Sequence, residues 1–269
     1  GKYRLGLTGG VRERIFHSPF SAPFGGFVFL KEDIRIPFID RAIQLLIEWT
    51  DEHNLSAINI TLPPPIYQQR FIAKQINSFY RAGFMVSVLD LNYTFDLNNF
   101  SEDYLSMVWR NARKNLLMAF KQDLEFKKCN SAEEKHLAYE VIRKNRISKG
   151  FPLRMSWVQV QETTKLIQAD FFLVFDEAGN PVASAIVFHV SDKIVQVIYW
   201  GDNAAAPGTK AMNFLSYKIF EYYKNLEIKI IDIGPSTENS MPNYGLCEFK
   251  ESIGCEINIK FTCSKTLRP

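Results

Sequence analysis

The chain has 269 residues and a mass of 31.0 kDa, with 46% apolar and 23% charged residues. This balance is typical of a globular protein and excludes a disordered tail, a collagen and a coiled coil. No apolar run approaches the ~20 residues that cross a bilayer, so we expect no membrane insertion. Four cysteines form no CxxC pair and have no histidine at ligand spacing. They predict no metal site and indicate reduced thiols in a cytoplasmic protein.

The first hundred residues predict alternating strands and helices. A helix is expected over 37–53, where apolar residues recur at the three- and four-residue spacing of one helical face: Phe38, Ala42, Leu45, Leu46 and Trp49. Pro37 suits the first turn of that helix, since its missing N–H would have no partner there. Around this helix we expect strands at 3–7, 26–30, 57–62 and 84–91, and a second helix over 67–81.

A long amphipathic helix is expected over 104–121. It follows a polar stretch, and we place a domain boundary between residues 100 and 101, bridged by this helix. Beyond it the pattern predicts further elements: strands at 124–128, 171–175, 182–190, 194–200 and 228–233, and helices at 132–147, 157–168, 209–224 and 246–252. A final strand alternates apolar and polar residues, which predicts that one set faces the core: Cys255, Ile257, Ile259, Phe261 and Cys263.

The net charge of +3 is unevenly distributed. Residues 110–154 carry twelve Lys/Arg and five acids, a local excess of +7. Such a segment favours an anionic partner, for example a phosphate-bearing ligand, a nucleotide or RNA, although the solvated faces of surface helices give the same pattern.

The most informative stretch follows a predicted buried strand. Asp232, Gly234 and Ser236 stand at its carboxyl end, where open α/β sheets place ligands. A polar loop follows, and then the run Gly245–Gly254, which contains Phe249 and Lys250. As a purely structural alternative, these residues form a turn and a solvated helix face.

This Asp-x-Gly-x-Ser strand end, followed by a Gly-Leu-x-x-Phe-Lys helix and a last strand, resembles the C-terminal signature of FemA/FemB/FemX-like proteins. These are double-domain members of the GNAT acyltransferase superfamily. The segment 109–114, with Arg113, resembles the family's arginine-bearing segment. The resemblance implies an α/β fold of two GNAT-like domains, 1–100 and 101–269, with mixed, mostly antiparallel sheets flanked by helices and the first domain lacking its opening elements.

The same resemblance implies an N-acyltransferase. It would move an acyl or aminoacyl group from a coenzyme A thioester or an aminoacyl-tRNA to a small-molecule or peptidyl amine, with a cell-wall precursor as one acceptor. Lys250 would stabilise charge near the reacting carbonyl, beside substrate-binding Phe249, Asp232, Ser236 and Arg113.

The loop that holds the coenzyme A pyrophosphate in many GNAT enzymes departs from their pattern here. Gly208 takes the central glycine position, but Ala205 and Lys210 occupy the two outer positions. Small residues at a helix N-terminus still offer N–H groups to phosphate, so Gly208, Thr209 and Lys210 are candidate donor-binding residues. The altered loop leaves open a non-catalytic GNAT pair that binds a phosphate-bearing or nucleotide-linked ligand.

Overall fold

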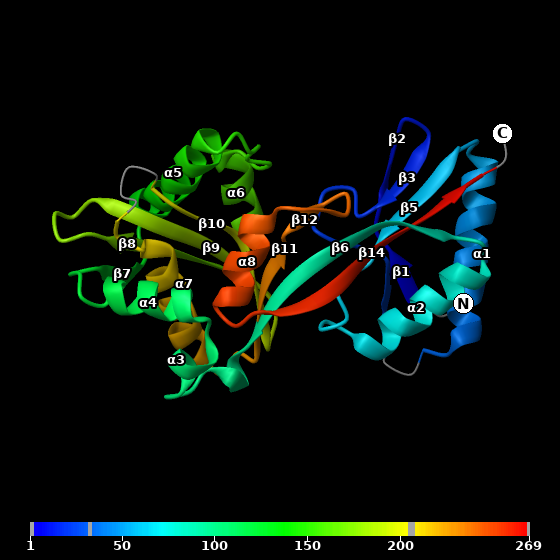
Figure 1. Ribbon diagram of the computed structural model, residues 1–269. Helices are drawn as coiled ribbons and strands as arrows, with labels where there is room; N and C mark the ends of the chain where they lie inside the picture. Colours follow the sequence, from blue (N-terminus) through cyan, green and yellow to red (C-terminus); the bar gives the residue numbers. More distant parts are fainter. Residues whose placement is uncertain (1–2, 32–33, 204–207, 268–269) are drawn as a thin grey trace. The chain divides into compact units, whose positions relative to one another are not determined.

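The computed structural model describes residues 3–31, 34–203 and 208–267 (Figure 1). Its helices are α1 (Ile36–Glu52), α2 (Gln69–Arg81), α3 (Tyr104–Met107), α4 (Arg110–Ala119), α5 (Ala132–Ser148), α6 (Trp157–Thr164), α7 (Ala211–Lys224) and α8 (Tyr244–Ser252). Its strands are β1 (Leu5–Leu7), β2 (Gly10–Arg12), β3 (Ile15–Ser18), β4 (Phe27–Phe29), β5 (Ala57–Thr61), β6 (Met85–Asp96), β7 (Glu125–Lys128), β8 (Ala169–Phe175), β9 (Pro181–Ser191), β10 (Ile194–Asp202), β11 (Ile230–Pro235), β12 (Thr237–Glu238), β13 (Met241–Pro242) and β14 (Glu256–Thr266).

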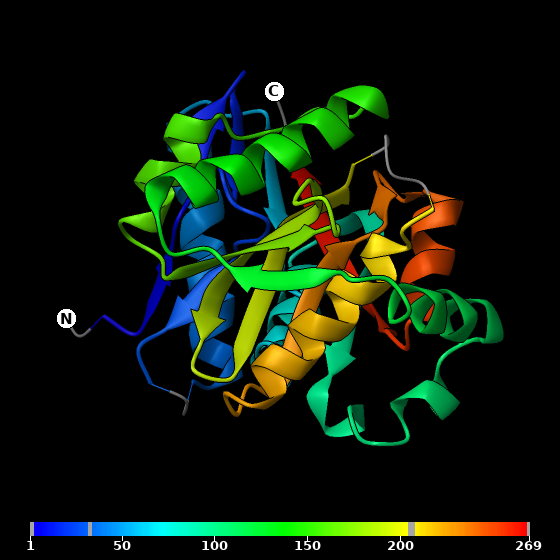
Figure 2. The same ribbon diagram turned by 90° about the vertical axis from the view of Figure 1, so that its left-hand side faces the viewer.

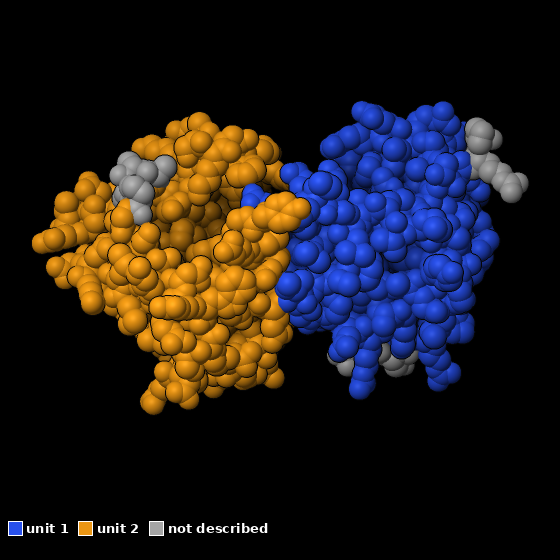
Figure 3. Space-filling model, in the orientation of Figure 1, with its two compact units in different colours: residues 1–92, 235–243, 257–269 blue, residues 93–234, 244–256 orange. Residues whose placement is uncertain are grey.

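The chain divides into two compact units (Figure 3). Unit 1 holds residues 1–92, 235–243 and 257–269, and unit 2 holds residues 93–234 and 244–256. The expected boundary at residues 100 and 101 assigns the whole C-terminal region to the second half, whereas these units return the last strand to the first. The reason is strand pairing, because β14 runs antiparallel to β5 from Thr262↔Thr61 to Thr266↔Ala57.

Unit 1 contains the strand order β2-β3-β5-β14-β6. Strand β3 is parallel to β5, and a separate pair, β1 and β4, is antiparallel. One core joins the helices to these strands, with Ile39 and Ile43 of α1 and Ile72 and Phe79 of α2 buried against Ile58 of β5. The face of α1 predicted from the sequence is correct at Leu46 but wrong at Phe38, Leu45 and Trp49, which are exposed, and the buried stripe runs through Ile39 and Ile43 instead.

Unit 2 contains the strand order β6-β11-β10-β9-β8-β7. Its sheet lies between two helical layers, seen with α5 in green and α7 in gold in Figure 2. Val195 and Val197 of β10 lie in the core beside α4 and α7, whereas Tyr199 lies in the core beside α5 and α6. The helices α5 and α6 each begin with a capping box, with Ser131 and Ser156 as the N-cap residues. Each box stabilises its helix by accepting from one of the first free N–H groups.

The helix expected over 104–121 is wrong as a continuous element. The structure breaks it into α3 and α4, because Val108 and Trp109 have extended backbone with ψ of 154° and 152°. The Trp109 N–H then donates to the Ser252 carbonyl at 3.0 Å. Among the described residues, no helix combines the length and apolar character needed to cross a membrane.

The final strand also departs from its expected facing. Cys263 is buried as predicted, but Ile257 and Ile259 are exposed and Lys260 is buried. The apolar alternation is correct, whereas the expectation that Ile257 and Ile259 face the core is wrong.

Candidate functional site

Strands β10 and β11 are parallel neighbours in unit 2, and the site begins where their pairing ends. The pairing covers Ile194–Gln196 and Ile230–Asp232, although β10 continues to Asp202 and β11 to Pro235. A register shift between Val197 and Tyr199 interrupts the pairing of β10 with β9. Such a bulge re-aims side chains, and here it sends Tyr199 into the α5–α6 core while Trp200 stays in the opposite core.

Asp232 fixes the carboxyl end of β11. It is fully buried, and its Oδ2 accepts a hydrogen bond from Gln196 Nε2 at 2.7 Å. Its Oδ1 accepts from the Gly234 N–H at 2.9 Å. Gly234 has a φ of +75°, a left-handed conformation that strains any residue with a Cβ. The Asp-x-Gly motif is therefore a side-chain-capped turn that only glycine completes without strain.

Lys250 closes the same turn from helix α8. Its Nζ donates to the carbonyl oxygens of Ile233 at 3.0 Å and Gly234 at 2.9 Å, and it lies 5.2 Å from the centre of the Tyr93 ring. The side chain is 1% exposed. Burial lowers the pKa of Lys250 to about 8, and the Asp232 carboxylate is one of the groups that oppose this change. The structure thus brings Asp232 and Lys250 into one buried turn.

Aromatic residues enclose this turn. Phe249 packs edge-on against Trp200, with ring centroids 5.9 Å apart. The buried Tyr93 donates from its hydroxyl to Glu251 Oε1 at 3.0 Å, and burial raises the pKa of Tyr93. The space-filling view shows unit 2 hollowed near this region, over β10 and beneath the α5–α6 segment (Figure 3).

Two further predicted site residues make hydrogen bonds on other elements. Arg113 is on α4, where one guanidinium nitrogen donates to the Ser106 carbonyl at 3.0 Å and its buried Nε has no hydrogen-bond partner among the described residues. Ser236 belongs to unit 1, where its N–H donates to the Leu91 carbonyl at 3.0 Å and its own carbonyl accepts from Asn243.

The predicted donor loop leads into α7. Lys210 is the N-cap residue, with a φ of 54°, and Gln122 Nε2 donates to the Gly208 carbonyl at 3.3 Å. Thr209 lies between them, partly buried. Ala205 falls outside the described residues.

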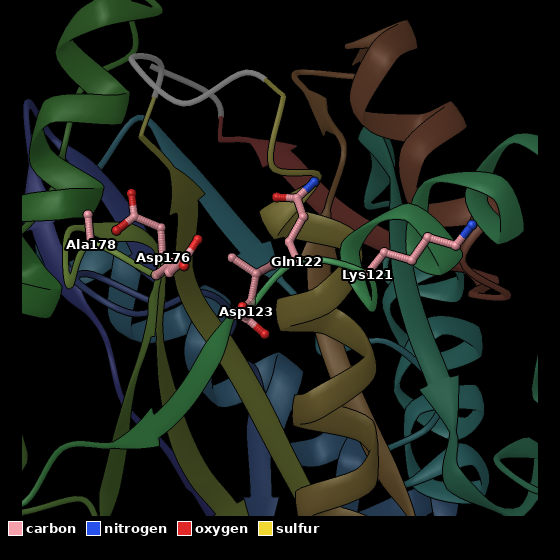
Figure 4. A pocket seen from close by; sticks show the side chains of 7 residues that line it. Lys121, Gln122, Asp123, Asp176 and Ala178 are labelled. Atoms are coloured by element: carbon pink, nitrogen blue, oxygen red, sulfur yellow. The ribbon is translucent and has the colours of Figure 1, made fainter.

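Next to this loop is a hollow of about 700 Å³, lined by Lys121, Gln122, Asp123, Leu124, Asp176, Glu177 and Ala178. Figure 4 shows Asp123 and Asp176 beside it, while the Lys121 side chain extends away from them. Three carboxylates therefore dominate its lining. Within residues 3–31, 34–203 and 208–267, no group of three or more His, Cys, Asp or Glu side chains could hold a metal ion.

Sequence reasoning did not single out Arg146, Tyr199 or Gln196. One signal could have identified Arg146: it stands four residues after buried Ile142 and seven after buried Tyr139, so it continues the apolar face of α5. A charged residue on an apolar helix face is unusual, and this position could have marked Arg146 as a candidate functional residue. No comparable sequence signal pairs Gln196 with Asp232, because strand register decides that contact.

No protein-family model and no curated protein matches the chain. Solved structures do. A FemX crystal structure matches with a TM-score of 0.71 at 12% identity, covering 97% of this chain and 84% of FemX. The C-terminal domain of a putative lysylphosphatidylglycerol synthetase from Agrobacterium fabrum matches with a TM-score of 0.68 at 11% identity, covering 97% and 80%. A GCN5-related N-acetyltransferase from Sphaerobacter thermophilus gives 0.52 at 10% identity, covering 99% and 78%. The chain therefore has the FemX-like GNAT fold.

Proposed function

We propose that this chain is a FemX-like transferase that moves an acyl or aminoacyl group onto an amine. One observation supports this above the others: the buried Lys250 ammonium is locked to the Asp232–Gly234 turn, where β10 and β11 separate. In α/β sheets, ligands bind beyond the carboxyl ends of the strands at such a divergence.

The acceptor amine would attack the activated carbonyl directly, because the buried thiols of the chain are unsuited to form a covalent intermediate. Burial raises the pKa of Cys255 and of Cys129 to about 12, and that of Cys263 to about 11. These three thiols stay protonated at neutral pH and make poor nucleophiles. The nitrogen–carbon bond forms, the carbonyl oxygen takes up negative charge, and the bond to the donor then breaks. The departing oxygen or sulfur carries away the electron pair and receives the proton that the amine loses.

Lys250 would act on the charged intermediate. A fixed positive charge in a desolvated site stabilises a developing oxyanion without reorganisation, and one such donor contributes about 3 kcal/mol. Its carbonyl partners and Asp232 hold it in place, so this stabilisation is preorganised.

For the donor, we propose an aminoacyl-tRNA in preference to a coenzyme A thioester. A pyrophosphate at Gly208–Lys210 would lie beside the hollow lined by Asp123, Asp176 and Glu177. Repulsion between like charges opposes that arrangement. The acceptor that we propose is an amine on a cell-envelope precursor.

Transfer of a radiolabelled amino acid from a mixture of aminoacyl-tRNAs to such precursors tests the proposal, with acyl-coenzyme A mixtures assayed in parallel. Lys250→Met should lower kcat by about two orders of magnitude, corresponding to the loss of about 3 kcal/mol of transition-state stabilisation. Lys144→Met, an exposed change of the same kind on α5, should leave kcat unaltered. An unchanged rate in Lys250→Met refutes the role of Lys250. Binding of these donors without any transfer would favour the non-catalytic module instead.

A further inference from the structure

Arg146 is a second cation of unit 2, within electrostatic range of Lys250. It lies in the last turn of α5, and its guanidinium carbon is 6.0 Å from the centre of the Tyr199 ring. The residue is half-buried, and burial lowers its pKa. The bulge in β10 creates this arrangement, because it turns Tyr199 toward α5.

The carboxylates on and near α5 already have other partners. Asp202 accepts from Asn145 Nδ2 at 2.8 Å and pairs with Lys149 at 3.2 Å. Glu140 pairs with Arg143 at 2.8 Å. Within the described parts of the chain, the Arg146 guanidinium makes no hydrogen bond or ion pair. A partly desolvated charge without an acceptor in the protein is unfavourable, so an external anion would stabilise it.

The surrounding charge and hydrogen-bond donors favour an oxyanion. Arg146 and Lys250 lie within electrostatic range of each other, and the buried carboxylate that acts on Lys250 is Asp232. Lys250 is buried and Arg146 half-buried, and Arg154 is a further cation within electrostatic range of Arg146. Tyr199 adds a donor: its oxygen accepts from the Met155 N–H at 3.2 Å. In the described part of the structure its own O–H proton has no acceptor.

We propose that Arg146, with the Tyr199 hydroxyl, binds a phosphate group of the donor or acceptor used by this site. The planar guanidinium fork matches two oxygens of a phosphate, and a phosphate carries enough negative charge to neutralise the excess left by Arg146 and Lys250. The identification of the ligand as a reaction partner rests on the proposed function; the anion site itself does not.

Inorganic phosphate, added to the full chain at constant ionic strength, tests the site without any transfer reaction. We expect phosphate to raise the thermal midpoint, since a ligand that binds the folded state stabilises it, and isothermal titration calorimetry to give its Kd. Arg146→Gln should weaken binding at least about tenfold, because it removes a charge-assisted pair. Arg146→Lys should give an affinity between those of the wild type and Arg146→Gln, since lysine keeps the positive charge but lacks the planar guanidinium. Lys144→Gln, the same charge change on an exposed part of α5, should stay within about twofold of the wild type, as screening attenuates exposed charges.

The unliganded midpoint separates a ligand-binding arginine from a structural one. Arg146→Gln removes a desolvated charge that lacks a partner, so its midpoint should equal or exceed that of the wild type. A lower midpoint with unchanged phosphate affinity would overturn the proposal, as would equal affinities of the wild type and Arg146→Gln. Acetate binding as tightly as phosphate would also overturn it, by showing a carboxylate site.

Two further probes identify the source of the phosphate. Binding of the trinucleotide CCA that depends on Arg146 assigns it to a tRNA donor, and such binding of glycerol 3-phosphate assigns it to a phospholipid-like acceptor. If neither depends on Arg146, the site is not used by a substrate. Loss of transfer in Lys250→Met together with intact phosphate binding would support both proposals, whereas absent transfer with phosphate binding that depends on Arg146 would remove only the proposed function.

Discussion

The buried Lys250 ammonium should make stability depend on pH, and Lys250→Met isolates that dependence. An ordinary lysine has a pKa near 10.5, and burial lowers that of Lys250 to about 8. Between these two values the unfolded chain binds a proton that the folded chain does not. The unfolding free energy contributed by this residue therefore rises as pH increases across that window.

The gap of about 2.5 pH units corresponds to about 3 kcal/mol, at about 1.4 kcal/mol per unit. Below pH 8 the ammonium is charged in both states, and this destabilisation is fully present. Above pH 10.5 the group is neutral in both states, and the destabilisation is gone. Methionine also removes the hydrogen bonds to Ile233 and Gly234, but this constant cost cancels when two pH values are compared.

Urea unfolding of both proteins, followed by tryptophan fluorescence at about pH 6.5 and pH 10.5, measures the effect. The stability of Lys250→Met relative to the wild type should fall by about 3 kcal/mol between the two pH values. Tyrosine and cysteine titrations occur in both proteins and largely cancel. Lys144→Met should show a flat difference. A flat difference for Lys250→Met as well would refute the reasoning, because it would mean that the ammonium reaches water in solution.

Two substitutions test contacts elsewhere in unit 2. Gly201→Ala would place a Cβ 2.8 Å from Asn145 Cγ, so unfolding in urea should show a loss of about 1–3 kcal/mol from overpacking. Asp170→Asn removes a buried carboxylate that pairs with Lys128 and His189, each at 2.7 Å, and should cost about 3–5 kcal/mol. Burial opposes ionisation of Asp170, but these partners hold its pKa below the usual range; the wild-type advantage should therefore persist above pH 4 and vanish as acid protonates the folded state.

Local signals predicted much of the fold because they act within one element. Apolar periodicity predicted the bounds of α1 nearly to the residue, although not its buried face, and the alternation of strands and helices predicted the order of elements in unit 2. The break at Val108 and Trp109 carries no such signal. Both residues continue an amphipathic pattern, and the extended backbone is stabilised by a distant acceptor, the Ser252 carbonyl.

The prediction of which face of the last strand is buried was wrong for a related reason. Alternation predicts that a strand has two different faces, but tertiary packing decides which face is covered. Ile259 is 40% exposed and Lys260 only 9%, so the covered face changes along β14. A pattern of period two contains no information about that change.

The candidate site was predictable as a set of residues and not as a set of contacts. The motif around Asp232 and Lys250 identified both residues, yet it suggested a lysine directed at substrate. The structure places its ammonium on two main-chain carbonyls. Arg146 belongs to a basic segment, and net charge alone could not distinguish it from solvated neighbours such as Lys144. Whether a basic side chain has a carboxylate partner makes that distinction, and this depends on where the fold places the Asp and Glu residues.

This difference in partnering separates the roles of the buried Lys250 and the half-buried Arg146. Lys250 has two carbonyl acceptors and a carboxylate within electrostatic range, so its charge is balanced within the protein and is present before any ligand arrives. Arg146 has no acceptor within the described residues, so under our proposal a bound anion balances its charge. A site that must hold a phosphate-bearing ligand and stabilise a transient oxyanion requires one cation of each kind. Desolvated charge of this sort lowers folded-state stability in exchange for function, and the second cation should be the one whose removal leaves the unliganded protein no less stable.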